Sequence, residues 1–275
     1  MKVARALRET NERLDSAGCE SPDVDAEILV AHVLAVSRSE LALDRSRKLS
    51  KVEAAELEGL VARRETREPL AYVLGEWGFR RLTLRVDRRV LVPRPETEVV
   101  VDRCLARIAH LAEPRVLDVG TGSGAIALAI ADEHPGAHVT GVDASSGALE
   151  VAGANVVRTG LAVELRAWDL FTGLPEGPWD LVVSNPPYVL PEELESLEPE
   201  VSEWEPRTAL AGVGETEAVA RGARDVLAAD GALVLEVAAG DSGRVTALLD
   251  ELGYDDVTTT HDLAGRDRVV EGTRQ

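Results

Sequence analysis

Cysteines, basic residues and long apolar runs are scarce in this sequence of 275 residues, and each shortage excludes a class of protein. The two cysteines, Cys19 and Cys104, are far apart and outside any C-x-x-C pattern, so we expect neither a disulfide framework nor a thiolate metal site. No apolar run reaches the roughly 18 to 20 residues of a membrane-spanning helix, and the N-terminal segment lacks the apolar stretch of a signal peptide. These features predict a cytoplasmic protein without a membrane partner.

Acidic residues outnumber basic ones by 49 to 30, which gives a formal net charge of −19 at pH 7. A surface with this excess repels polyanions, and basic side chains that neutralise phosphates supply most of the non-specific affinity for nucleic acids. We therefore expect no direct nucleic-acid binding. The five histidines are scattered and form no zinc signature, so no metal site is expected either.

Three segments with different patterns divide the chain. Residues 1–73 show helical periodicity without a cluster of catalytic side chains, and they predict a small helical bundle that serves as an accessory domain. Residues 74–95 predict a β-hairpin linker, with strands at 81–86 and 90–92 that flank a turn. Residues 96–275 alternate extended and helical segments, which is typical of a mostly parallel sheet covered by helices. Its strands are expected at 115–119, 138–142, 162–166, 180–184, 232–237, 255–260 and 268–272.

A glycine-rich loop, Gly120-Thr121-Gly122-Ser123-Gly124, lies between the first of these strands and the apolar helix AIALAIAD. Its glycines allow a sharp turn and a close approach of the backbone to a ligand, and the helix N-terminus offers amide donors. The loop also satisfies the dinucleotide fingerprint G-x-G-x-x-G/A. From these residues alone, a nicotinamide cofactor and S-adenosylmethionine both remain possible.

Other side chains at strand ends complete a candidate cofactor site. Asp143 follows the second strand, where its carboxylate could accept hydrogen bonds from both hydroxyls of a ribose. Trp168 follows the third strand, where its ring could stack on adenine or pack under a loop. Asp118, inside the first strand, could contact the amino-acid end of a methionine moiety or be satisfied by the backbone.

The fourth strand is followed by Asn185-Pro186-Pro187-Tyr188, which is the most specific indication of function in the sequence. Because prolines have no N–H, this corner presents carbonyl acceptors with few competing donors, and the side-chain oxygen of Asn185 adds another acceptor. Two acceptors can hold both hydrogens of a planar –NH2 group, with the ring of Tyr188 against it. Such a corner would aim the nitrogen of an amide or aromatic amine at the methyl group of a sulfonium.

The glycine loop and the Asn-Pro-Pro-Tyr corner together resemble the class I S-adenosylmethionine-dependent methyltransferases that act on planar amino groups, which have a Rossmann-like, mostly parallel seven-stranded sheet. Almost the whole chain resembles the HemK/PrmC protein-(glutamine-N5) methyltransferases, through REPLAY at 67–72, PRPETE at 93–98 and LAGRDR at 263–268. Residues 205–210 also keep the family's pattern and suggest a substrate-facing loop. The chain departs from the family after Glu236, where valine and alanine follow instead of glycine and glutamine.

The resemblance implies an activity and the residues that perform it. S-adenosyl-L-methionine would be the cofactor, and the substrate would be the glutamine of the Gly-Gly-Gln motif in class I peptide chain release factors, which act in translation termination. The helical domain 1–73 would recognise this substrate. The implied cofactor-binding residues are Gly120, Thr121, Gly122, Ser123, Gly124, Asp143, Trp168 and Asn185, and the implied catalytic residues are Asn185, Pro186, Pro187 and Tyr188.

Three other functions compete with this interpretation. An Asn-Pro-Pro-Tyr corner could hold adenine N6 equally well, so an N6-adenine or other amino-group methyltransferase acting on DNA or RNA is the main alternative, against which the net charge argues. A nicotinamide oxidoreductase would need a proton-relay residue, and none is visible around Tyr188. A non-catalytic binding module is disfavoured by the intact Asn185 and glycine loop.

The net charge also bears on the protein partner, because an acidic protein is attracted electrostatically to a basic one.

Overall fold

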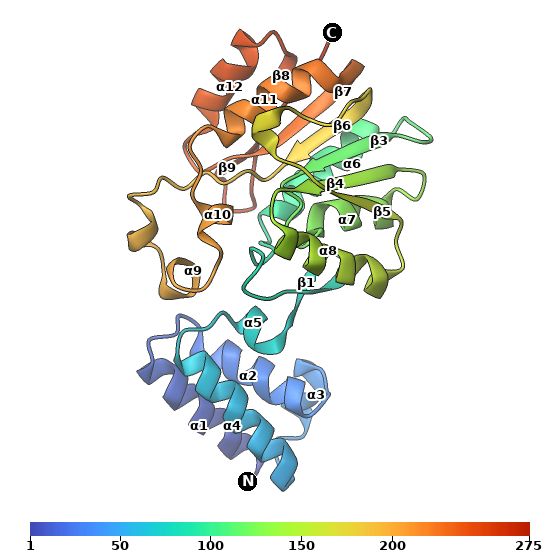
Figure 1. Cartoon of the computed structure of the whole chain (residues 1–275). Coiled ribbons are helices and arrows are strands. Elements are labelled where there is room, and N and C mark those ends of the chain that lie inside the picture. Colours follow the sequence, from blue (N-terminus) through green and yellow to red (C-terminus); the bar gives the residue numbers. More distant parts are fainter. The chain divides into compact units, whose positions relative to one another are not determined.

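The computed structural model describes all 275 residues, and the chain divides into two compact units (Figure 1). Unit 1 comprises Met1–Glu76 together with Glu198–Trp204. Unit 2 comprises Trp77–Leu197 and Glu205–Gln275. None of the helices in either unit combines the length and the apolar character that a membrane span requires.

Unit 1 is a helical bundle around a leucine-rich core. Leu14, Leu29 and Leu57 are each at most 2% exposed and come from three different helices. Ser50 and Glu53 form a capping box at the start of α4, since each side chain accepts a hydrogen bond from the other residue's backbone N–H. The helices are α1 (Val3–Ser16), α2 (Pro22–Val33), α3 (Arg38–Leu43), α4 (Lys51–Glu65), α5 (Leu70–Leu74) and α9 (Pro199–Ser202).

A buried ion cluster holds the segment Glu198–Trp204 to the rest of unit 1. Arg64 is only 5% exposed, and its guanidinium donates to Asp25 at 2.8 Å and to Glu200 at 2.8 Å. Glu200 also accepts from Nε of Arg67 at 2.7 Å. Each carboxylate of the cluster therefore has a cationic partner, which compensates for its removal from water.

Replacing Arg64 by methionine is expected to lower the free energy of unfolding by about 3 kcal/mol, because it leaves the carboxylate of Asp25 buried without its partner. Arg13→Met is the matched control. Arg13 pairs with Glu58 and Glu65, but its side chain is one-third exposed, so its loss should cost less than about 1 kcal/mol. Urea denaturation of both variants measures the difference, and equal losses would contradict the role assigned to burial.

The hairpin of the linker lies earlier in the chain than the sequence predicts. Its strands are β1 (Glu76–Phe79) and β2 (Leu82–Arg85), and the turn between them includes Arg80 with a positive φ of 50°. The strand expected at 90–92 is wrong. The two valines of that run are 1% and 5% exposed, so their apolar character reflects burial in an irregular segment and not pairing in a sheet.

Seven strands of unit 2 form one sheet in the order β5-β4-β3-β6-β7-β9-β8. The first five pair in parallel, whereas β9 is antiparallel to both β7 and β8. The expected mostly parallel, seven-stranded sheet is therefore confirmed. The strands are β3 (Arg115–Val119), β4 (His138–Asp143), β5 (Val163–Ala167), β6 (Trp179–Ser184), β7 (Leu227–Glu236), β8 (Asp255–His261) and β9 (Asp267–Thr273).

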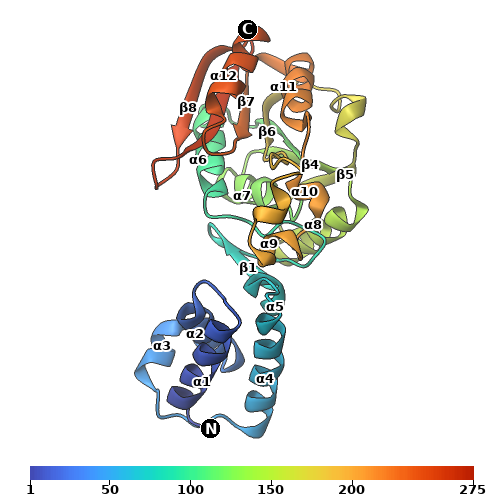
Figure 2. The ribbon, with the colours of Figure 1, turned by 90° about the vertical axis from the view of Figure 1, so that its left-hand side faces the viewer.

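Helices cover both faces of this sheet (Figure 2). Val116 and Leu117 show why both faces are apolar: the first joins the core under α6 and α7, and the second joins the core under α11 and α12. Successive strand residues point to opposite faces, so consecutive residues of a strand buried on both sides are mostly apolar. The helices of unit 2 are α6 (Thr97–Ile108), α7 (Ala125–Glu133), α8 (Ser146–Thr159), α10 (Arg207–Leu210), α11 (Glu215–Val226) and α12 (Ser242–Glu251).

The strand order places a topological switch point beside β3. Val119, the last residue of β3, pairs with Val142 of β4 on one side and with Ser184 of β6 on the other. The residues that follow these three positions therefore meet at the carboxyl edge of the sheet. In open α/β sheets, ligands bind in the crevice at such a point.

Candidate functional site

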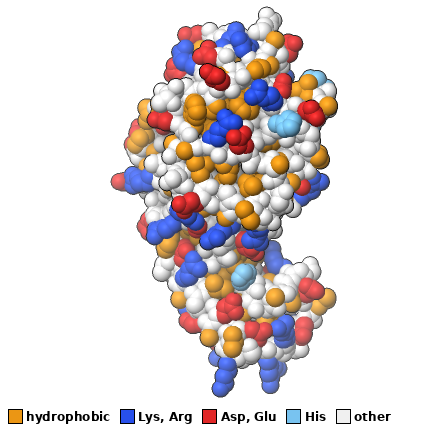
Figure 3. Space-filling model, turned by 45° about the vertical axis from the view of Figure 1, so that its right-hand side comes forward, with side chains coloured by type: hydrophobic (Ala, Val, Ile, Leu, Met, Phe, Trp, Pro, Cys, Tyr) orange, Lys and Arg blue, Asp and Glu red, His pale blue; other side chains and the backbone are white.

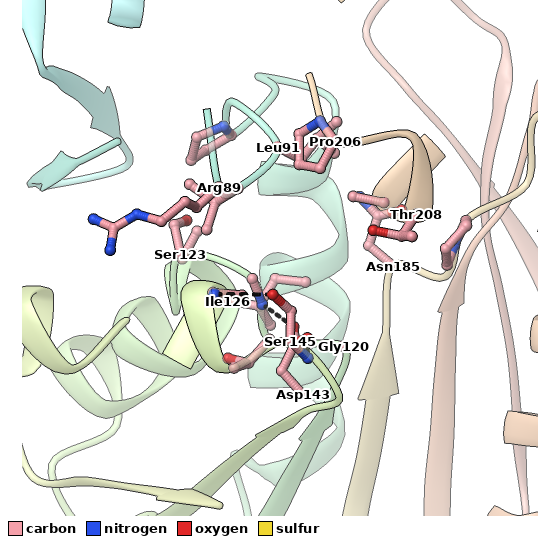
Figure 4. A pocket seen from close by; sticks show the side chains of 18 of the residues that line it. Arg89, Leu91, Gly120, Ser123, Ile126, Asp143, Ser145, Asn185, Pro206 and Thr208 are labelled. Atoms are coloured by element: carbon pink, nitrogen blue, oxygen red, sulfur yellow. Dashed lines mark hydrogen bonds between the residues drawn. The ribbon is translucent and has the colours of Figure 1, made fainter. Parts of the chain in front are cut away.

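Two adjoining cavities open at this switch point, both within unit 2. The larger has a volume of about 460 Å³ and the smaller about 230 Å³. Both are bordered by Gly120, Asp143, Ala144, Pro187 and Thr208, so these residues form their common wall. Figure 4 shows the larger cavity, with Asp143 and the glycine loop on one side and Asn185 on the other.

The glycine loop forms one wall of the larger cavity through its first four residues, 120–123. Gly120 has a φ of 74°, and a Cβ atom added there would meet no atom within 4 Å, so the backbone lies open toward the cavity. Gly124 lines neither cavity. It precedes α7 with a φ of 81°, and an added Cβ would lie 3.3 Å from Leu128. The fifth residue of the loop therefore allows the helix to begin, whereas the first exposes backbone to a ligand.

Asp143, the last residue of β4, lines the cavity and also stabilises the glycine loop through hydrogen bonds. Its Oδ2 accepts a hydrogen bond from the backbone N–H of Gly122 at 2.9 Å, and its Oδ1 accepts from that of Ser145 at 2.8 Å (Figure 4). An ionised carboxylate has about four acceptor positions, so two remain for hydroxyl groups of a ligand. This contact between Asp143 and the glycine loop was not predicted from the sequence.

Asp118 is buried beneath the loop and does not line either cavity. Its Oδ2 accepts from the hydroxyl of Thr121 at 2.7 Å and from the backbone N–H of Ala127 at 3.2 Å. Burial raises the pKa of this carboxyl to about 7. Of the two roles that the sequence left open for Asp118, this geometry supports the structural one.

Trp168 contributes to the wall of the smaller cavity, together with Asp169 and Phe171. The indole N–H of Trp168 donates to the carbonyl of Gly173 at 2.7 Å, which fixes the ring relative to the following turn. Asp169 accepts from the backbone N–H of Phe171 at 2.9 Å and begins that turn. Phe171 is 64% exposed, and no periodicity in the sequence distinguishes it. These side chains give the smaller cavity aromatic walls suited to a flat ring.

The Asn-Pro-Pro corner begins where β6 ends. The hydroxyl of Ser184 donates to the carbonyl of Val119 at 2.7 Å and ties the end of β6 to the end of β3. Asn185 lines the larger cavity, Pro186 the smaller one and Pro187 both. The structure therefore brings the corner to the same crevice as the glycine loop and Asp143.

Tyr188, the last residue of the corner, is not among the residues that border the two cavities, and its assignment to the substrate stays a prediction. Its hydroxyl lies 3.4 Å from Oε1 of Glu236, and burial raises the pKa of the phenol to about 12. The next residue, Val189, forms an isolated bridge with Ala211 and donates its N–H to the carbonyl of Leu210, which ties the corner to the segment that carries Thr208 and Ala209 of the larger cavity.

Several residues of the cavity wall were not assigned from the sequence. Arg89, Leu91 and Pro93 of the linker line the larger cavity, as do Pro206 and Thr208 of the segment expected to face the substrate (Figure 4). The PRPETE motif was noted, but its members were given no role. One of them, Thr97, lines the larger cavity beside Asn185.

Comparisons with known proteins agree with this architecture. The family model described as the PrmC N-terminal domain matches residues 5–75, and the methyltransferase small domain matches residues 99–198. The catalytic domain of hMettl16, solved with an RNA hairpin, shares the fold with a TM-score of 0.58 at 17% sequence identity, over 84% of this chain and 85% of that one.

Two curated relatives match along nearly their entire length. The release factor glutamine methyltransferase of Caulobacter vibrioides is 39% identical over 100% of this chain and 97% of its own. That of Cereibacter sphaeroides is 41% identical over 98% of each chain. The chain therefore belongs to the release factor glutamine methyltransferase family.

Proposed function

We propose that this protein transfers a methyl group from S-adenosylmethionine to the side-chain amide nitrogen of the glutamine in the Gly-Gly-Gln motif of class I peptide chain release factors. The observation that carries the proposal is the position of Asn185, Pro186 and Pro187. These residues lie at the carboxyl edge of the sheet and border the crevice that Asp143 and the glycine loop border from the other side.

The residues around the crevice fit S-adenosylmethionine. The open backbone at Gly120, the free acceptor positions of Asp143 and the aromatic wall at Trp168 suit its amino-acid, ribose and adenine parts respectively. S-adenosylmethionine would supply a methyl group bound to a positively charged sulfur. As the nitrogen–carbon bond forms, the sulfur–carbon bond would break with S-adenosylhomocysteine as the leaving group, and the nitrogen would release one of its two hydrogens as a proton to the solvent.

The amide of glutamine is a weak nucleophile because its nitrogen lone pair is delocalised into the carbonyl group. Asn185 offers Oδ1 as an acceptor, and the corner of Pro186 and Pro187 offers backbone carbonyls. Two acceptors that hold the two amide hydrogens fix the plane of the –NH2 group. Orientation of two bound reactants can contribute about 7–11 kcal/mol to lowering a barrier. The chain's own contribution is therefore mainly positioning.

Methylation of a nucleic-acid amino group is the competing function, since the same corner could hold adenine N6. The net charge of −19 disfavours a polyanionic substrate. Over most of the face of unit 2 shown in Figure 3, acidic and basic side chains are interspersed. A basic protein partner, by contrast, would be attracted by the acidic surface.

A labelled-methyl assay tests the proposal with release factor, ribosomal RNA and DNA offered in parallel. The matched control is the same release factor with alanine in place of the motif glutamine. We expect label only on the unaltered release factor, and mass spectrometry of its peptides should place one methyl group on the motif glutamine. Label on nucleic acid and none on release factor would overturn the proposal.

A further inference from the structure

A buried polar chain leads from the PRPETE motif to the candidate catalytic corner. Thr97, the fifth residue of the motif, is 5% exposed at the start of α6, and Glu236, the last residue of β7, is 1% exposed. Ser184 pairs with Leu235 in the parallel ladder of β6 and β7, so Asn185 and Glu236 leave their strands at the same level. Thr97 contacts both of them.

The distances define a relay of two hydrogen bonds. Oγ1 of Thr97 lies 2.7 Å from Oε2 of Glu236, and Nδ2 of Asn185 lies 3.4 Å from Oγ1 of Thr97. An ionised carboxylate can only accept, so the single hydroxyl hydrogen of Thr97 is donated to Glu236. Toward Asn185 the hydroxyl then presents only its lone pairs.

This relay distinguishes the two ways in which the amide of Asn185 could be turned. With Nδ2 toward Thr97, the amide donates to a free lone pair. With Oδ1 toward Thr97, two acceptors would face each other in a half-buried position without a hydrogen between them, which is unfavourable. The first orientation therefore prevails, and it leaves Oδ1 as the group directed at the larger cavity.

We propose that Thr97 and Glu236 are positioning residues, which keep Oδ1 of Asn185 turned toward the substrate so that it can accept a hydrogen from the –NH2 group. This inference rests on the proposed function for its kinetic consequences, but the orientation of the amide is a property of the free protein. It also gives Thr97, in the PRPETE motif, a role in the reaction that neither residue type nor spacing suggested.

The groups around Glu236 determine its charge. Tyr188 lies 3.4 Å from its Oε1, Arg268 of β9 lies 3.9 Å away, and Glu96 acts on it from the start of α6. The guanidinium of Arg268 also forms an ion pair with the carboxylate of Asp262 at 3.4 Å. Burial outweighs these contacts and raises the pKa of Glu236 to about 7. Near neutral pH the carboxylate therefore exists in both protonation states.

Thr97→Val removes the hydroxyl while keeping the shape of the side chain, and Thr97→Ser keeps the hydroxyl. We expect the valine variant to lower kcat about thirtyfold, because the amide of Asn185 is then free to turn, and the serine variant to retain most of the wild-type rate. Binding of S-adenosylmethionine, measured by calorimetry, should change less than about threefold in both. A serine variant as slow as the valine variant, or a valine variant as fast as wild type, would overturn the inference.

The pH profile provides a second test. When Glu236 is protonated it can donate to Thr97, whose hydroxyl hydrogen can then turn toward Asn185 and favour the opposite amide orientation. The rate of wild-type protein is therefore expected to rise with pH through an apparent pKa near 7. Glu236→Gln keeps an acceptor but cannot titrate, so this acid limb should disappear. If the rate of the variant still fell at low pH as in wild type, a group other than Glu236 would titrate, and this result would contradict the relay.

A spectroscopic measurement separates this inference from the proposed function. Solvent exchange of the side-chain hydrogen of Asn185 that faces Thr97, followed by NMR in the full-length protein without substrate, should be slow in wild type and Thr97→Ser. It should be at least about tenfold faster in Thr97→Val, which lacks the acceptor. Exchange that is equally fast in all three proteins would overturn the inference. A wild-type protein that protects this hydrogen but leaves release factor unmethylated would overturn only the proposed function.

Discussion

Asn185→Ala is expected to slow methyl transfer by about a thousandfold while S-adenosylmethionine affinity stays within about tenfold. The substitution removes Oδ1, one of the two acceptors that hold the –NH2 group of the substrate. The position of Asn185 on the larger cavity, across from the glycine loop, explains why cofactor binding should be less affected. Loss of orientation affects the reacting state more than binding.

Single-turnover rates with release factor, together with calorimetric titration of S-adenosylmethionine, measure the two effects separately. Circular dichroism and the melting temperature of the variant control for misfolding. If affinity for S-adenosylmethionine fell as far as the rate, Asn185 would act mainly on the cofactor, and its assigned role in holding the amide would be wrong.

The second large effect is expected at Asp143, where replacement by alanine should weaken S-adenosylmethionine binding about a hundredfold. The variant loses the acceptor for ligand hydroxyls and also the hydrogen bonds that hold Gly122 and Ser145 in place. Both losses act on the same side of the crevice. The effect should therefore exceed that of a single hydrogen bond.

Calorimetry of three variants resolves the contributions at this position. Asp143→Asn retains one oxygen acceptor and should lose only about tenfold in affinity. Asp132→Ala removes a carboxylate of α7 that pairs with Arg81 away from the cavities, and it should leave affinity unchanged. Unchanged affinity in Asp143→Ala would remove the aspartate from the cofactor site.

The sheet and the cofactor side of the crevice could be predicted because local patterns determine them. Strands buried on both faces are mostly apolar, as in the run Leu181-Val182-Val183 of β6. A glycine-rich loop between a strand and a helix has few explanations other than the close approach of a ligand to its backbone. The position of Asp143 beside the crevice could be predicted because the carboxyl end of a strand in a parallel sheet is a position that faces ligands.

Features that depend on distant parts of the chain were not predictable. Glu200 pairs with Arg64, which lies 136 residues earlier, and no local pattern indicates that this acidic residue belongs to unit 1. The direction of Tyr188 depends on Glu236, which comes from another strand. The apolar run at 90–92 resembles a strand because burial selects the same residues in irregular segments.

The role of Thr97 also depends on distant parts of the chain. Its motif was visible in the sequence, but its contacts with Asn185 and Glu236 arise only when α6, β6 and β7 come together. Hydroxyl groups occur at many positions for many reasons, so residue type alone cannot identify a positioning role. The relay depends on the order of strands in the sheet.

The structure of the complex with S-adenosylhomocysteine and a Gly-Gly-Gln peptide would show how the substrate amide is held. We expect the glutamine amide nitrogen to lie within hydrogen-bonding distance of Oδ1 of Asn185 and of a backbone carbonyl of the Pro186–Pro187 corner, and to face the sulfur. A glutamine bound elsewhere, or an amide whose carbonyl oxygen and not its nitrogen meets Asn185, would contradict this expectation.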